Sequence, residues 1–252
     1  MPIACYCLHI RSHLLAPSLV QPPIAPRCLI LGPSGSSKTT FLYRLKNNQY
    51  FPTVPTNGVN IEELEVTRKT SLVFSDIGGS DRREVRLHFL NSVPIQDLSI
   101  LYFVDASAPI DTLPGVLEEL VYHVTYARHR AGGTKYVGIV LNKQDLIGPR
   151  DRAYMVQELK TEVDKVMEMI MKEPLLEKKD DTMMWEVLDG GKLGISAKTG
   201  EGVKEVFNTV AKAVFGVEEK HQPKLLETVK HGHMGGHGRL LGAVTGHSAA
   251  VA

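Results

Sequence analysis

Short runs of hydrophobic residues alternate with longer amphipathic stretches through the middle of the chain. The runs at 28–31, 98–104 and 136–141 are largely apolar and only a few residues long, which predicts buried strands. The stretch 151–173 instead repeats hydrophobic residues every three or four positions, which predicts a long amphipathic helix. The residues that share its apolar face are Met155, Leu159, Val163, Val166 and Ile170. Strands that alternate with helices favour a mostly parallel sheet with helices on both faces.

The remaining elements complete this α/β pattern. Residues 59–66 and 70–76 predict two strands around a polar turn, the antiparallel exception in an otherwise parallel sheet. A last short strand is expected at 193–195, which makes the sheet six-stranded. The other helices are expected at 38–47, 83–91, 112–130 and 202–215.

The chain divides into three regions. Residues 1–26 contain five prolines, which argues for an irregular N-terminal arm. Residues 27–216 carry the alternating pattern and are expected to form one domain, with a surface insertion at 174–192. Residues 217–252 end in a stretch rich in Gly, His and Ala with few large apolar side chains, so a disordered tail is predicted.

Composition narrows the class of protein. Hydrophobic residues make up 43% of the 252 residues and charged residues 23%, which is typical of a soluble globular protein. The net charge of +1 is too small to attract nucleic acid electrostatically, so no nucleic-acid partner is expected. No apolar run is long enough for a transmembrane anchor. The cysteines Cys5, Cys7 and Cys28 show no clear pairing, which suits a reducing, cytoplasmic setting.

A glycine-rich segment follows the first predicted strand and opens the first predicted helix. Backbone N–H groups of such a loop can bind phosphate oxygens, and the helix N-terminus adds a favourable dipole. Lys38 is expected to reach the outer phosphates of a nucleotide, and Thr39 to ligate Mg²⁺. Ser37 stands where the usual pattern has glycine, so a glycine-rich turn that only caps a helix remains the alternative. The expected nucleotide-binding positions here are Gly32, Ser34, Gly35, Ser36, Ser37, Lys38, Thr39 and Thr40.

A second candidate segment, Asp76-Ile77-Gly78-Gly79, ends the predicted strand at 70–76. Asp76 can hold Mg²⁺ through water, and the backbone N–H of Gly79 can approach a terminal phosphate closely. Taken alone, a strand followed by a Gly–Gly turn explains this segment better.

A third segment, Asn142-Lys143-Gln144-Asp145, follows the predicted strand at 136–141. The Asp145 carboxylate can accept two hydrogen bonds from the N1–H and exocyclic amino group of guanine, an arrangement that adenine does not offer. The alkyl stem of Lys143 can lie on the base, and Asn142 can tie this loop to the phosphate loop. A polar loop after a strand is the alternative.

The last candidate segment, Ser196-Ala197-Lys198, lies between the last predicted strand and helix. Its backbone can support the guanine carbonyl oxygen, and Lys198 can cover the edge of the base. Each of the four motifs is weak by itself. Their order, and their place on the predicted elements, together predict a site for GTP or GDP with Mg²⁺.

These motifs resemble the Arf/Arl branch of the small GTPases of the Ras superfamily. The segment from Phe51 to Asn60 is similar to the first switch of that family, and the Asn-Lys-Gln-Asp motif has its Arf-like form. The resemblance covers residues 27 to about 216. It implies a P-loop G domain in which Thr56 binds Mg²⁺ and the terminal phosphate only in the triphosphate state, with the metal held by Thr39, Thr56 and Asp76.

The chain also departs from that family. The water-orienting glutamine falls at Ser80, which is too short for the role, so intrinsic hydrolysis is expected to be slow or completed by a partner. Pro2 excludes Arf-type myristoylation, while lipidation at Cys5 or Cys7 stays open. The long helix and its insertion also resemble the β subunit of the signal-recognition-particle receptor. The catalytic positions that the resemblance implies are Lys38, Thr56, Gly79 and Ser80.

The function that follows is an Arf-like molecular switch in membrane trafficking. Its switch regions are expected to meet an exchange factor, an activating protein and effectors, with the protein cytoplasmic or peripheral on an endomembrane. Because of Ser37 and Ser80, a non-switching pseudo-GTPase scaffold, or a receptor-subunit-type G domain, stays open as a second hypothesis. An ATP-dependent kinase of the P-loop class is disfavoured by the segment from Asn142 to Asp145.

Overall fold

The computed structural model describes residues 25–78, 83–92, 98–129, 133–174 and 182–216. Most of the proline-rich arm and the whole C-terminal tail lie outside these residues, as do Gly79 and Ser80. The expected division into arm, domain and tail therefore stays a prediction.

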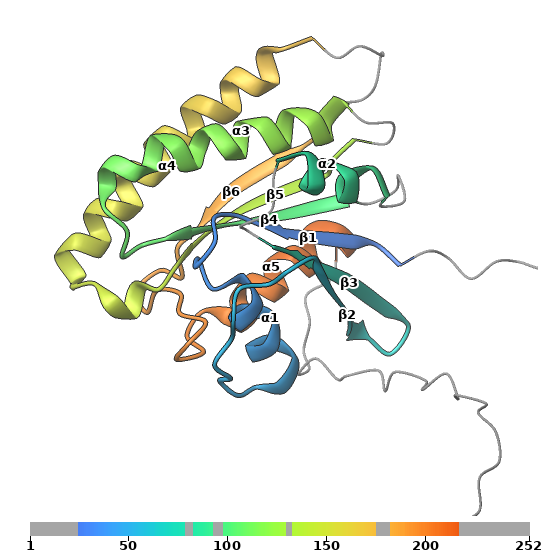
Figure 1. The fold of residues 1–252 in the computed structure, drawn as a ribbon, viewed down its shortest axis with the longest axis horizontal. Helices are drawn as coiled ribbons and strands as arrows, with labels where there is room; N and C mark the ends of the chain where they lie inside the picture. Colours follow the sequence, from blue (N-terminus) through green and yellow to red (C-terminus); the bar gives the residue numbers. More distant parts are fainter. Residues whose placement is uncertain (1–24, 79–82, 93–97, 130–132, 175–181, 217–252) are drawn as a thin grey trace, which may run out of the picture.

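The core of the described chain is a six-stranded sheet in the order β2-β3-β1-β4-β5-β6 (Figure 1). The strands are β1 (Arg27–Leu31), β2 (Val59–Thr67), β3 (Thr70–Ile77), β4 (Leu98–Asp105), β5 (Tyr136–Asn142) and β6 (Met184–Leu188). The β2–β3 pair is antiparallel and all other pairs are parallel. The predicted mostly parallel, six-stranded sheet with one antiparallel pair is confirmed.

Helices cover both faces of the sheet (Figure 1). One face carries α1 (Lys38–Asn47) and α5 (Val203–Phe215), and the other carries α2 (Arg83–Ser92), α3 (Leu113–His129) and α4 (Pro149–Lys172). Two short 3₁₀ helices lie at Ile110–Thr112 and Gln144–Leu146. Each face buries its own hydrophobic cluster, because strands buried on both sides present apolar side chains to both helical layers.

The predicted last strand at 193–195 is wrong. The sixth strand, β6, lies inside the stretch predicted as a surface insertion and pairs in parallel with β5, Tyr136 opposite Met184. It is an edge strand whose residues alternate between exposed and partly buried, so it lacks the continuous apolar run of a central strand. Trp185 and Val187 point to the core side and pack against its hydrophobic cluster. Residues 193–195 form a loop instead.

The fold brings the candidate motifs to one edge of the sheet. Because β1, β3 and β5 run in the same direction, their carboxyl ends meet at this edge. The phosphate-loop segment follows β1, Asp76 lies near the end of β3, and the segment from Asn142 to Asp145 begins at the last residue of β5. Ligands of open α/β sheets bind at such an edge.

Candidate functional site

The loop between β1 and α1 has a backbone that only certain residues tolerate. Gly32 has a φ of 132°, and a Cβ there would lie 2.5 Å from the carbonyl oxygen of Phe103 on β4. Gly35 has a φ of 83°. Both glycines are therefore required by the path of the chain, which folds the loop over the start of α1.

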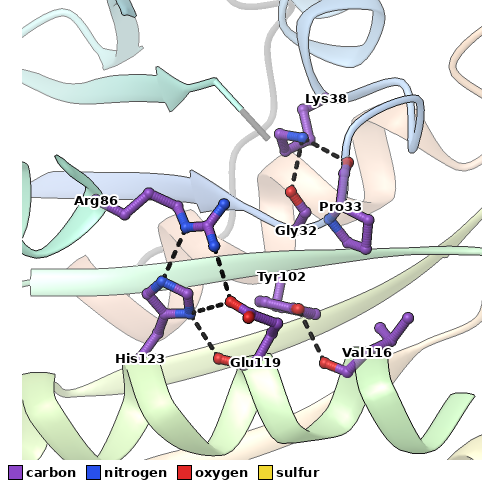
Figure 2. Close-up of polar contacts among 8 residues, drawn as sticks. All are labelled: Gly32, Pro33, Lys38, Arg86, Tyr102, Val116, Glu119 and His123. Atoms are coloured by element: carbon purple, nitrogen blue, oxygen red, sulfur yellow. Dashed lines mark hydrogen bonds and ion pairs between the residues drawn. The ribbon is translucent and has the colours of Figure 1, made fainter. Parts of the chain in front are cut away.

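Lys38, the first residue of α1, lies almost completely buried under this loop. Its Nζ donates hydrogen bonds to the carbonyl oxygens of Gly32, at 2.9 Å, and Pro33, at 2.8 Å (Figure 2). Burial lowers the pKa of Lys38 to about 8, with Asp76 opposing the shift and Arg86 adding to it. The amine is still mostly protonated at neutral pH. It is therefore a cation held against the loop, where a phosphate oxygen can replace the two carbonyls as its partner.

Ser37 adopts the left-handed backbone conformation, with φ 65° and ψ 32°. It is the N-cap residue of α1, yet its side chain makes no capping hydrogen bond. The left-handed conformation costs a residue with a Cβ about 1–2 kcal/mol of conformational free energy. The serine at this position thus carries the strain that a glycine would avoid.

Replacement of Ser37 by glycine is expected to raise the free energy of unfolding by about 0.5–1 kcal/mol. Relief of the left-handed strain outweighs the extra entropy that glycine has in the unfolded chain. Chemical denaturation of nucleotide-free protein measures the change. Ser34→Gly in the same loop is the matched control, because Ser34 is not among the described residues with a positive φ. This control should leave stability unchanged or lower it, and a similar gain in both variants would contradict the strain argument.

Three elements supply a cluster of oxygen atoms beside Lys38. The Thr39 hydroxyl on α1 donates a 2.6 Å hydrogen bond to Oδ2 of Asp76 on β3, and the Thr56 hydroxyl lies 2.6 Å from that of Thr39. Thr56 and Asn60 also donate to the same carboxylate oxygen, at 3.4 and 3.3 Å. All the predicted metal-binding residues therefore meet in one place.

The chemistry of this cluster fits Mg²⁺. The Oδ1 atom of Asp76 is buried and has no hydrogen-bond partner among the residues that the structure describes. Burial raises the pKa of Asp76, and the hydrogen bond from Thr39 and the charge of Lys38 oppose that shift. Carboxylate and hydroxyl oxygens are ligands that Mg²⁺ prefers. A buried, unpaired carboxylate oxygen beside two hydroxyl groups is a suitable anchor for a hydrated cation.

A cavity of about 310 Å³ opens between this cluster and the chain that precedes β2. Residues from the phosphate loop and the start of α1 form one wall, and Tyr50 and residues 52–56 form the other. The Thr40 and Thr53 hydroxyls join the two walls at 2.9 Å. The segment predicted as the first switch thus closes over the loop predicted to hold phosphate.

Asn142, at the end of β5, connects the phosphate loop to the loop before α5. Its Nδ2 donates to the carbonyl oxygen of Ser36 at 2.9 Å, and its Oδ1 accepts from the backbone N–H of Ala197 at 3.0 Å. The side chain is fully buried. Ser196 and Ala197 are buried beside it, while Lys198 is exposed. Asn142 lies 106 positions after Ser36 and 55 positions before Ala197 in the sequence, and its side-chain amide joins both.

Asn142→Ala is expected to lower the free energy of unfolding by about 2–4 kcal/mol, because the Ser36 carbonyl and the Ala197 N–H both lose a buried partner. Denaturant titration of the nucleotide-free protein checks this value. Asn47→Ala, at an exposed position near the end of α1, is the control and should change stability by less than about 0.5 kcal/mol. Equal effects of the two variants would show that the bridge contributes little.

In the segment after Asn142, the Asp145 carboxylate is exposed and the Lys143 side chain forms an ion pair with Asp105. Asp145 is exposed at the 3₁₀ turn and does not line the cavity between the phosphate loop and residues 50–56. Lys143 has a φ of 63°, and its Nζ lies 2.5 Å from Oδ2 of Asp105 at the end of β4. Burial acts to raise the pKa of Asp105, but the hydrogen bonds from Lys143 and Ser107 outweigh it and hold the pKa below its usual value.

Two residues of this region had not been predicted. Asp105 orients Lys143, and it lies at the same sheet edge as the other motifs, directly opposite Asn142 in the β4–β5 register. Arg44 on α1 donates to the backbone carbonyls of Ala197, at 3.3 Å, and Lys198. Asp105 could have been predicted, because it is an acidic residue at the end of a buried strand. Arg44 could not, because no local sequence pattern indicates its role. Gly79 and Ser80 lie outside the described residues.

The fold and site together define a P-loop GTPase domain. The family model of the ADP-ribosylation factor family matches residues 17–214, most of the chain. The chain therefore belongs to the ADP-ribosylation factor family of small GTP-binding proteins.

Individual relatives agree with this assignment. The chain is 34% identical to ADP-ribosylation factor 1 of Brassica rapa subsp. pekinensis over 53% of its own length and 69% of that protein. It is 35% identical to human ADP-ribosylation factor-like protein 4C over 47% of its own length and 60% of that protein. A chain in "The Structure of the Mammalian SRP Receptor" shares the fold, with a TM-score of 0.55 and 21% identity over 74% of this chain and 99% of that one.

No helix in the described ranges is both long enough and apolar enough to cross a membrane.

Proposed function

We propose that this protein is an Arf-like molecular switch that binds GTP and GDP with Mg²⁺ and hydrolyses GTP slowly by itself. The observation that supports this most directly is the meeting of Thr39, Thr56 and Asp76 beside Lys38. A cation site and a fixed positive charge at the start of a helix are the arrangement that binds the outer phosphates of a nucleotide.

The residues around Lys38 bind the phosphates and the cation in different ways. Lys38 neutralises charge on the outer phosphates, and the N–H groups of the loop and of the first turn of α1 donate to the phosphate oxygens. Thr39 and Thr56 offer hydroxyl ligands, and Asp76 orients the hydrated cation from behind. Mg²⁺, when bound there, supplies electrostatic stabilisation of the charge that develops on the leaving phosphate oxygens.

Base selection is assigned to the loops after β5 and before α5. Asp145 accepts hydrogen bonds from the N1–H and amino group of guanine, and the backbone N–H of Lys198 supports its carbonyl oxygen. Asp105 holds the Lys143 ammonium, so the alkyl stem of that lysine is oriented to lie along the base. Arg44 supports the loop by binding two of its carbonyls.

Switching follows from the position of Thr56. The segment 50–56 contacts the first turn of α1 through short side chains, Thr56 to Thr39 and Thr53 to Thr40. Loss of the terminal phosphate removes a partner from Thr56 and from Gly79, so both switch segments relax and a protein-binding surface changes. Effectors, an exchange factor and an activating protein are the partners that recognise such a surface. Trafficking at an endomembrane is the process we assign to it.

A pseudo-GTPase scaffold, or a receptor-subunit-type G domain that acts through protein interactions, is the second candidate. The observation that favours it is the left-handed Ser37, whose side chain stands in the phosphate loop at a position suited to glycine. Under this alternative the fold is retained while nucleotide affinity or turnover is lost.

Equilibrium binding and turnover separate the two candidates. Fluorescent GTP, GDP and ATP are titrated into the full chain with and without Mg²⁺, and phosphate release is followed over many turnovers. The proposed switch binds both guanine nucleotides with Mg²⁺-dependent affinity, excludes ATP, and turns over slowly. Ser80→Gln is expected to raise the turnover rate, because the longer amide can orient water. Absence of guanine-nucleotide binding under every condition contradicts the switch and leaves the scaffold.

A further inference from the structure

One residue of the segment from Asn142 to Asp145 directs its side chain into the interior of the protein without a role assigned so far. Gln144 is 1% exposed, although Asp145 beside it is exposed and Lys143 is partly exposed. It is the first residue of the 3₁₀ helix Gln144–Leu146. An inward side chain between two outward ones is placed to hold the backbone of this turn.

The Gln144 amide joins the end of β5 to the loop that follows β6, its neighbour at the sheet edge (Figure 1). Its Nε2 donates to the carbonyl oxygen of Leu141 at 2.7 Å and to that of Asp189 at 2.8 Å. Carbonyl oxygens accept and cannot donate, so these contacts assign the nitrogen of the amide to this side. The Oε1 atom is buried and has no hydrogen-bond partner within the described ranges. Packing alone does not explain a buried amide with an unpaired oxygen, which indicates a role for its two donated bonds.

The backbone of Gln144 is held from two further sides. Its N–H donates to the carbonyl oxygen of Ile195 at 3.1 Å, and its carbonyl oxygen accepts from Nη2 of Arg152 at 3.3 Å. The Asp145 carboxylate, in contrast, accepts no hydrogen bond from the part of the chain that the structure describes. The direction in which Asp145 points therefore depends on the backbone that Gln144 holds.

The loop 189–194, between β6 and Ile195, packs directly against this amide. Gly194 has a φ of 78°, and a Cβ there would lie 2.7 Å from Oε1 of Gln144. A Cβ at Gly190 would lie 2.3 Å from the carbonyl oxygen of Gly194, so the loop closes on itself. Both positions require glycine, because backbone or amide atoms occupy the space of a side chain. A side chain at position 194 thus displaces the Gln144 amide.

Helix α4 holds the other side of the same loop. Nζ of Lys160 pairs with Oδ2 of Asp189 at 2.7 Å, and Nη1 of Arg152 donates to the carbonyl oxygens of residues 192 and 193, both at 3.1 Å. Because Arg152 also donates to Gln144, one guanidinium joins the loop to the 3₁₀ turn. The loop is therefore a fixed support for the turn that carries Asp145.

We propose that Gln144 is a positioning residue for guanine recognition, which holds Asp145 in the plane of the base by tying the 3₁₀ turn to the loop 189–194. The inference rests on the proposed function, because it specifies what orients the carboxylate that selects guanine. Two hydrogen bonds to one carboxylate require both of its oxygens to lie near the plane of the base. When the amide bonds are lost, the turn rotates and the carboxylate keeps only one of the two.

The ratio of the affinities of the full chain for GTP and inosine triphosphate measures this orientation. Inosine keeps the N1–H of guanine and lacks the exocyclic amino group, so the ratio reports the second hydrogen bond to Asp145. In the parent a ratio of about tenfold or more is expected, the usual effect of a hydrogen bond to a charged group. Gln144→Met keeps the length of the side chain and removes both donors, and it is expected to reduce the ratio to about threefold or less. A merely structural role would lower both affinities equally and leave the ratio unchanged.

Two alanine variants of the loop provide an independent readout, which decides the matter even if Gln144→Met does not fold. In Gly194→Ala the new Cβ meets the Gln144 amide, so the ratio is expected to fall to about threefold or less. Gly191→Ala is the matched control, because its φ of 57° is also left-handed but a Cβ there meets nothing within 4 Å. Its ratio is expected to stay within about twofold of the parent. Equal ratios in the two loop variants overturn the proposal.

The outcomes separate this inference from the proposed function. A parent that binds no guanine nucleotide overturns both. A parent that binds GTP and inosine triphosphate equally well overturns this inference together with the base selection assigned to Asp145. A parent that prefers GTP, with the same preference in Gln144→Met, overturns this inference alone.

Discussion

Replacement of Lys38 by methionine is expected to lower the affinity for GTP and GDP by about 100-fold or more. Its ammonium group is nearly buried and donates two short hydrogen bonds to the loop carbonyls, so it is already placed where phosphate oxygens bind. Charge-assisted hydrogen bonds contribute about 1.5–3 kcal/mol each, and two of them account for the expected loss. Methionine keeps the aliphatic stem and removes only the charge and its donors. Titration with fluorescent nucleotide measures the change.

Lys46→Met is the matched control for this prediction. Lys46 lies on the same helix, eight residues further along, and pairs with Glu62 on β2 at 2.7 Å. About 12 Å of helix separate it from Lys38, so its loss should change nucleotide affinity less than about twofold. If Lys38→Met binds GTP within threefold of the parent, the phosphate-binding role assigned to Lys38 is wrong.

Asp145→Asn is expected to lower the affinity for guanine nucleotides by about 100- to 1,000-fold and to raise the affinity for xanthosine triphosphate. The carboxylate accepts two donors of guanine, whereas an amide presents a donor to one of them and leaves a polar group without a partner. Xanthine carries a carbonyl oxygen where guanine carries its amino group, and this oxygen accepts from the asparagine. Competition between the two triphosphates measures the exchange of specificity.

The stability of Asp145→Asn shows whether its effect on affinity comes from base recognition or from a change in folding. Asp145 is exposed in the nucleotide-free protein, so its replacement should change the free energy of unfolding by less than about 0.5 kcal/mol. Asp151→Asn, an exposed carboxylate in the first turn of α4, is the control for the loss of charge and should leave base specificity unchanged. A loss of guanine affinity in both variants would point to net charge instead of base recognition.

Strand–helix order, the antiparallel pair and the phosphate-loop context could all be predicted from the sequence. They rest on local properties: short apolar runs, helical spacing, and glycines directly after a strand. The sixth strand could not be located in this way. Its alternating exposure at the sheet edge resembles a loop in composition, while the buried Ile195 made the neighbouring loop resemble a strand.

The sequence by itself determined which chemical groups are available and in which order: a lysine and a threonine at a helix start, an acid near the end of β3, an amide at the end of β5 and an acid just after it. Only the tertiary structure decided which of them meet. The parallel strands bring Asn142 to Ser36 and Lys143 to Asp105, and α2 packing on α3 brings Arg86 to His123. The physical reason is that hydrogen bonds between residues 37 to 106 positions apart depend on strand register and helix packing, which no local pattern encodes.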